Sequence, residues 1–138
     1  VIDVIHLKKI FWKDELGTEL EVSDLTTSDP QYKEATKQRD ELIETLGLYD
    51  DKLADEYLEG KKITNERIEE VLKKTIIANP SSTCILYVGS ALKNRGIQPL
   101  MDGIIKYLPS PLEKEPVKAV DSELGANVVR RPDKKDKF

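Results

Sequence analysis

The fold class follows from residues 83–108, which carry the sequence TCILYVGSALKNRGIQPLMDGIIKYL. Residues 83–88 form a continuous apolar run, which is typical of a strand buried on both faces of a sheet. A polar loop follows at residues 89–96, and residues 97–108 have the spacing of apolar side chains that predicts a helix. Strand, loop and helix in this order are half of a βαβ unit. Since one strand and one helix cannot close a sheet, we expect partner strands from outside the chain.

Residues 1–80 predict a region of another kind, with strands first and helices afterwards. Residues 1–12 and 19–22 are rich in β-branched and aromatic residues, and the turn-like residues 13–18 between them indicate a β-hairpin. Three amphipathic helices are expected to follow. The predicted start and end signals of these helices are Ser28-Asp29-Pro30 and Gly47, Asp50 and Gly60, and Thr64 and Asn79-Pro80.

The composition indicates a globular protein and restricts the function classes. Charged residues make up 35% of the 138 residues, and the net charge of -4 argues against broad binding of a phosphate backbone. No apolar run approaches the roughly 20 residues of a membrane-spanning helix. Cys84 is the only cysteine, so an internal disulfide is excluded. The chain starts at Val1 without a methionine and stops abruptly, so we expect a piece of a longer protein.

Three residues with distinctive chemistry are interpreted as structural. His6 is the only histidine and lies in a strand-like stretch without a second ligand or nucleophile nearby, so we expect a structural or surface role. Cys84 lies inside the apolar run and is expected to be a buried small hydrophobe. Trp12 is expected to pack in the core or on the hairpin. The sequence therefore indicates no catalytic residue and no metal ligand set in this chain.

The loop that follows the apolar run is a candidate binding element. In open α/β sheets, ligands bind beyond the carboxyl ends of the strands, and Gly89-Ser90-Ala91-Leu92 lies at such an end. Its small residues would let backbone N–H groups approach a flat ring. On these residues alone, an ordinary βα turn is the favoured interpretation.

The longer string resembles a known family. Residues 89–102 together with residues 107–111 closely resemble the end of the GTPase domain in the elongation factor G family. Upstream, residues 1–4, 15–18 and 50–60 resemble the insert within that domain. The resemblance runs in order through residues 1–118.

The resemblance implies an α/β fold class, a fragment of a P-loop GTPase domain with an inserted α+β subdomain. Residues 1–80 would be the inserted subdomain. Residues 81–111 would be the C-terminal strand, the fifth guanine motif and the helix of the GTPase domain. Residues 112–138 would be a linker to, or the start of, a following β-barrel domain. Within them, the basic residues of 130–135 could touch ribosomal RNA, although the aspartate among them favours a solvated linker.

The resemblance also implies a site. Ser90, Ala91 and Leu92 occupy the fifth guanine motif, whose backbone N–H groups meet the guanine O6 of GTP or GDP. The phosphate loop, the Asn-Lys-x-Asp motif and the Mg²⁺ ligands would lie outside this chain. We therefore expect the full-length protein to be a GTPase and this chain alone to hydrolyse no GTP.

The implied partner is the ribosome, in translocation during elongation or in ribosome recycling. Residues 93–100 and the long connection at 112–138 favour an organellar member, and hence a mitochondrial rather than a cytoplasmic location. The acidic residues between 40 and 60 are open to two interpretations: a solvated helix face, or a face that docks the large-subunit stalk protein. Glu41, Glu44 and Asp51 are the candidate docking residues. The alternative function is a docking module without chemistry.

Overall fold

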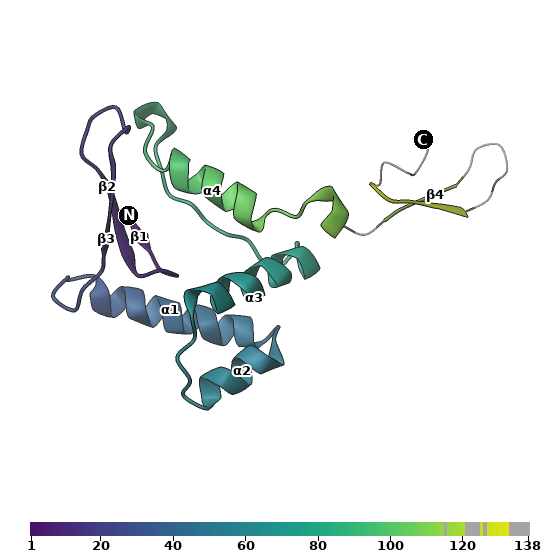
Figure 1. Cartoon of the computed structure of the whole chain (residues 1–138), viewed down its shortest axis with the longest axis horizontal. Helices are drawn as coiled ribbons and strands as arrows, with labels where there is room; N and C mark the ends of the chain where they lie inside the picture. The colour runs from purple at the N-terminus through teal and green to yellow at the C-terminus, as the bar shows by residue number, and fades with distance from the viewer. Residues whose placement is uncertain (115, 121–124, 126, 133–138) are drawn as a thin grey trace. The chain divides into compact units, whose positions relative to one another are not determined.

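The computed structural model describes residues 1–114, 116–120, 125 and 127–132. The chain divides into two compact parts, Val1–Tyr107 and Leu108–Phe138. The elements of the first part are β1 (Ile2–Asp3), β2 (Lys8–Trp12), β3 (Leu20–Asp24), α1 (Tyr32–Gly47), α2 (Asp51–Leu58), α3 (Asn65–Ala78), the 3-10 turn η1 (Ala91–Lys93) and α4 (Ile97–Tyr107) (Figure 1). The elements described in the second part are the 3-10 turn η2 (Pro111–Glu113), β4 (Val117–Val120) and β5 (Asn127–Arg130).

The predicted hairpin is confirmed. Strands β2 and β3 pair antiparallel with Ile10 opposite Val22, and the short β1 adds to the other edge of β2. The tip of the hairpin is organised by the carboxylate of Asp14, which accepts hydrogen bonds from the Thr18 N–H at 3.1 Å, the Thr18 hydroxyl at 2.6 Å and the Glu19 N–H at 2.9 Å. The tip is therefore a fixed turn.

Two of the three predicted helix starts are confirmed. The Asp50 side chain accepts from the Leu53 N–H at 2.9 Å at the start of α2, and the Thr64 hydroxyl accepts from the Arg67 N–H at 3.3 Å at the start of α3. Each side chain satisfies one of the N–H groups that a helix start leaves free. The predicted ends of α1 at Gly47 and of α3 before Asn79 are also present.

The predicted cap of α1 is wrong. This helix begins at Tyr32 after Gln31, without a side-chain cap. The carboxylate of Asp29 instead accepts from the Thr26 N–H at 2.8 Å and from the Lys9 ammonium at 2.7 Å. Since these partners tie Asp29 to the preceding turn and to β2, its side chain is not available to the helix.

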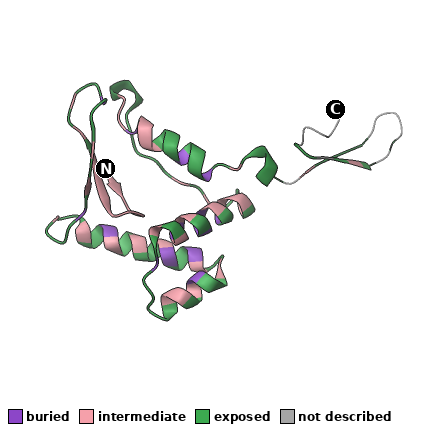
Figure 2. Ribbon diagram, viewed as in Figure 1, coloured by how far each residue is buried: buried purple, intermediate pink, exposed green. Residues whose placement is uncertain are grey.

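The core lies among the three helices of residues 1–80 and is closed by one residue of α4 (Figure 2). Its buried members are Ile43, Leu46, Leu53, Ile63, Ile68, Val71, Leu72 and Tyr107. Burial of each large aliphatic side chain contributes about 1.5–3 kcal/mol. One polar group also joins the segments around this core: the guanidinium of Arg39 donates to the Ile5 carbonyl at 3.1 Å, to the Ile63 carbonyl at 3.1 Å and to the Asn65 side chain at 2.9 Å.

The strand predicted at residues 83–88 is not formed in this chain, and its pairing with strands from outside the chain remains a prediction. The segment has no strand assignment in the structure and runs between α3 and η1, with Leu86 and Val88 exposed (Figure 1). Cys84, which was expected to be buried, is exposed as well. A strand forms only where a neighbour supplies backbone partners, and the described residues supply none here. Helix α4 lies where it was predicted, but its apolar residues Met101 and Ile105 are exposed.

The second part contains a small antiparallel ribbon in which Val117 of β4 lies opposite Arg130 of β5. The predicted boundaries at 80/81 and 111/112 remain predictions. Residues 133–135 of the basic segment lie outside the described residues. In the described part of the chain, no helix combines the length and the apolar character needed to cross a membrane.

Candidate functional site

The candidate guanine loop is a closed turn. The Ser90 N–H donates to the Arg95 carbonyl at 2.8 Å, and the Arg95 N–H donates back to the Ser90 carbonyl at 3.0 Å. Between these two residues lies η1, followed by Asn94 in the left-handed region at φ 49°. The paired bonds fix the base of the turn and leave its tip to project.

The tip presents small or exposed groups. Ser90, Ala91 and Leu92 are all exposed, and the Leu92 side chain has no protein cover. The N–H groups of Ala91 and Leu92 open the 3-10 turn, and the first N–H groups of a helix have no partner within the helix. The N–H groups of Ala91 and Leu92 therefore have no partner within the turn.

Two glycines form the narrow neck of this loop. A Cβ on Gly89 would lie 2.5 Å from the Arg95 carbonyl oxygen, and a Cβ on Gly96 would lie 2.7 Å from the Val88 carbonyl oxygen. Gly96 also has φ +87°, which side-chain-bearing residues rarely adopt. The two flanks of the loop thus approach each other more closely than any other residue would allow.

The tip of the β2–β3 hairpin contacts this loop (Figure 1). The Gly17 carbonyl accepts from the side-chain amides of Gln98 at 3.0 Å and Asn94 at 3.3 Å, and the Asp14 carbonyl accepts from the Arg95 guanidinium at 3.4 Å. No pattern in the sequence predicts this contact. The partners are 77 to 81 residues apart, and no local pattern indicates which distant loop a hairpin tip will contact.

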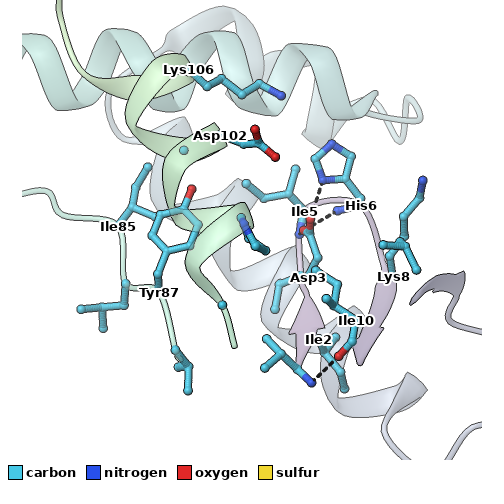
Figure 3. A pocket seen from close by; sticks show the side chains of 18 of the residues that line it. Ile2, Asp3, Ile5, His6, Lys8, Ile10, Ile85, Tyr87, Asp102 and Lys106 are labelled. Carbon is cyan, nitrogen blue, oxygen red and sulfur yellow. Dashed lines mark hydrogen bonds and ion pairs between the residues drawn. The ribbon is translucent and has the colours of Figure 1, made fainter. Parts of the chain in front are cut away.

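A groove of about 530 Å³ lies between the hairpin, residues 85–88 and α4 (Figure 3). Its walls are largely apolar and include Ile2, Ile10 and Ile85, together with Trp12, which is half-buried in β2. The Tyr87 ring packs where α4 has Gly103, since a Cβ there would lie 2.0 Å from the Tyr87 hydroxyl oxygen.

Charged groups meet at one end of the groove. His6 Nδ1 lies 2.8 Å from an Asp3 carboxylate oxygen, and His6 Nε2 lies 3.0 Å from a carboxylate oxygen of Glu69. Lys106 also pairs with Glu69. Burial, and then the Glu69 carboxylate, raise the pKa of Tyr107 beside this group. His6 thus lies in a turn between two carboxylates, which fits the structural role expected of it. Among the described residues, no group of acidic, histidine and cysteine side chains could hold a metal ion.

The acidic residues of α1 and α2 do not form one uniform face. Asp50 and Glu56 pair with Arg67 of α3 at 2.9 Å and 3.4 Å, so a residue from outside the range 40–60 compensates part of this acidic charge. The Leu53 N–H bond, and then the Arg67 charge, hold the pKa of Asp50 below its usual value.

The three candidate docking residues are exposed. Glu41 and Glu44 lie on α1, and Asp51 lies in the first turn of α2. Glu41 is 3.4 Å from Lys37, and Glu44 accepts from the Tyr57 hydroxyl at 3.3 Å. The first two border an open groove of about 580 Å³ along α1.

Comparison with known proteins gives a consistent set of relatives, although no protein-family model matches the chain. Over all 138 residues it is 40% identical to elongation factor G of Thermotoga neapolitana and 39% identical to that of Thermotoga maritima. Elongation factor G of Fervidobacterium nodosum is 42% identical over 122 residues, which are 88% of this chain and 17% of that relative. The chain is homologous to one segment of elongation factor G.

The chain spans only 19% of the length of the two Thermotoga elongation factor G sequences. A crystal structure of a Thermus thermophilus protein has the same fold, with a TM-score of 0.64 and 23% identity over 93% of this chain and 20% of that one. The predicted likeness to elongation factor G is therefore confirmed, and the fold is a mixed α/β fragment with small antiparallel sheets.

Proposed function

We propose that the chain is part of a ribosome-dependent translational GTPase that acts in translocation during elongation. The observation that carries this proposal is the match to a segment of elongation factor G along the whole chain, with Ser90-Ala91-Leu92 at the tip of a closed turn. The full-length protein would bind GTP and Mg²⁺ through a phosphate loop and catalytic residues outside residues 1–138.

In this proposal the loop recognises the base and performs no chemistry. A backbone N–H of Ala91 or Leu92 donates to the guanine O6. Adenine carries an amino group at that position, which would leave the donor unpaired. An unpaired buried donor costs about 1–3 kcal/mol, so one such contact favours guanine by roughly 5- to 150-fold.

Two narrower proposals concern the step of translation and the cellular location. The second step of translation in which the full-length protein could act is ribosome recycling. A mitochondrial location is supported by the string at residues 93–100 and by the length of the connection at 112–138.

The test uses the full-length protein carrying Ala91→Val or Ala91→Ile. A branched side chain at the tip should push the loop away from the guanine ring and weaken GDP binding by about tenfold, on the order of 1–3 kcal/mol for a steric misfit. The control is Ala119→Val, at an exposed position of β4. The measurement is the rate of GDP dissociation by stopped flow. Unchanged dissociation in both Ala91 variants would mean that this loop does not touch the base.

A second candidate is a docking module that binds the large-subunit stalk protein through its acidic helices. The exposure of all three residues favours it, as does the open groove on α1 that Glu41 and Glu44 border. Charge complementarity of this kind mainly sets the association rate and the choice of partner. If the full-length protein hydrolyses no GTP on ribosomes, the docking module replaces the GTPase.

Charge reversal tests this face. Replacing Glu41, Glu44 and Asp51 together by lysine should leave folding nearly intact, because exposed charges contribute little to stability. The same changes should slow ribosome-stimulated GTP turnover, most strongly at low salt. The matched controls are Glu41→Asp, Glu44→Asp and Asp51→Glu, which keep the charge. Normal turnover of the lysine variant at every salt concentration would assign these residues to a solvated surface.

A further inference from the structure

The contact between the hairpin tip and the candidate guanine loop is specific. A single carbonyl, that of Gly17, accepts hydrogen bonds from the side-chain amides of Asn94 at 3.3 Å and Gln98 at 3.0 Å. These two residues lie on either side of Gly96 in the neck of the loop. Gly17 is buried although it lies at the tip of a hairpin. Both of the amide side chains that face it are partly buried. The hairpin tip therefore packs against the loop.

Only glycine fits at the centre of this contact. A Cβ on Gly17 would lie 2.3 Å from the Lys93 carbonyl oxygen and 2.7 Å from the Asn94 carbonyl oxygen. These neighbours are backbone atoms of the loop, so they cannot give way as a flexible side chain would. Gly17 also has φ +67°. The backbone of the hairpin tip thus fixes how far the loop can approach the hairpin.

Both partners of the contact are ordered by their own hydrogen bonds. Asp14 holds the hairpin tip through Thr18 and Glu19, and Ser90 and Arg95 close the loop. A displacement of the loop at Lys93 is therefore transmitted to Ala91 and Leu92 in the same turn. A hydrogen bond weakens steeply once its angle falls toward 120° or its length exceeds the usual range, so a small displacement is enough to impair a donor.

We propose that the hairpin tip, residues 13–19, positions the guanine loop and that Gly17 is the positioning residue. The inference rests on the proposed function, because it assigns to Gly17 a role in guanine recognition by Ser90, Ala91 and Leu92. Gly17 itself touches no nucleotide. It sets the place from which the loop donates to O6.

The experiment compares two nucleotides in the full-length protein. Gly17→Ala forces Lys93 and Asn94 away and should weaken GDP binding by about five- to tenfold, the effect of losing one hydrogen bond. Binding of 6-thioguanosine 5′-diphosphate should change much less, since the sulfur that replaces O6 is a weak acceptor. The readout is the dissociation constant of 6-thioguanosine 5′-diphosphate divided by that of GDP, both measured by calorimetry. Gly17→Ala should lower this ratio, whereas a general loss of stability would not change it.

The chain provides a matched control. Gly60 has the same left-handed backbone at φ +71°, but no atom lies within 4 Å of a Cβ placed there. Gly60→Ala therefore carries the same backbone strain without the steric contact and should leave the ratio unchanged. Two further variants remove the contact without a clash. Asn94→Gly tolerates the positive φ, and Gln98→Met keeps the side-chain length. Each should lower the ratio by about twofold, as loss of a single long or partly exposed bond would.

The outcomes separate this inference from the proposed function. If Ala91→Val weakens GDP binding while Gly17→Ala, Asn94→Gly and Gln98→Met leave the nucleotide ratio unchanged, the positioning role is overturned and the guanine loop stands. Equal weakening of both nucleotides by Gly17→Ala would also overturn it. If Ala91→Val has no effect, the guanine loop itself fails. If Gly17→Ala does not fold, the Asn94 and Gln98 variants decide the matter alone.

Discussion

At the scale of single residues, two leucines of α2 differ completely in their surroundings. Leu53 is 0% exposed, and Leu58, five residues later, is 82% exposed. Leu53→Ala should lower the free energy of unfolding by about 2–5 kcal/mol, through lost transfer energy and the cavity left behind. Leu58→Ala in the same helix should change it by less than about 0.5 kcal/mol. Urea titrations of the two variants, followed by circular dichroism, measure both values, and equal losses would contradict the burial described here.

The hairpin tip should respond to acid. The hydroxyl of Thr18, and then the Glu19 N–H, lower the pKa of Asp14 from 3.8 to about 2. Because this pKa is lower in the folded state, the carboxylate stabilises the tip fully above about pH 4, and the stabilisation disappears as the pH falls through about 2. Amide exchange at Thr18 and Glu19, measured by NMR, should accelerate over that interval after correction for intrinsic exchange.

The matched variant for this titration is Asp14→Asn, which has no proton to gain. Its tip should be less protected at neutral pH and should show no further loss between pH 4 and 2. If the variant loses protection over the same interval as the original chain, another group controls the tip.

At the scale of elements, local sequence patterns predict those features that depend only on residues nearby in the sequence, such as helix caps. Asp50 and Thr64 cap their helices because a capping side chain needs only the N–H groups two or three residues ahead. The signal at Ser28-Asp29-Pro30 was misleading because Asp29 has a distant partner, Lys9, on β2. No strand forms at residues 83–88 in this chain, because an apolar run becomes a strand only beside another strand and the expected partner strands lie outside the chain. No local sequence pattern predicts the contact of Gly17 with Asn94 and Gln98, because the partners are 77 and 81 residues apart.

Elements should also differ in local stability. Helix α3 carries the buried residues Ile68, Val71 and Leu72, whereas residues 83–88 are mostly exposed and lack strand pairing. Local opening free energies follow the density of buried contacts. Hydrogen exchange followed by mass spectrometry should therefore be slow in α3 and fast in residues 83–88. Strong protection of residues 83–88 would show that they are paired in solution.

At the scale of the whole molecule, the chain by itself should not bind guanine nucleotides measurably. The loop offers one or two backbone donors, each contributing about 1 kcal/mol net, whereas micromolar affinity requires roughly 8 kcal/mol. Calorimetry with GDP and the 138-residue chain should show no binding at millimolar concentrations. Sub-millimolar binding would mean that this chain holds a second nucleotide contact besides the loop.

The buried hairpin tip has a consequence for protein engineering. Hairpin tips are usually the places where a fluorescent tag or an inserted peptide is tolerated. Here the tip at Gly17 is closed against another backbone, so an insertion there would separate the two segments. An open position is Gly60, which has no atom within 4 Å of an added Cβ. A reporter dye or an epitope placed at Gly60 would therefore label the protein without entering the contact that holds residues 89–96.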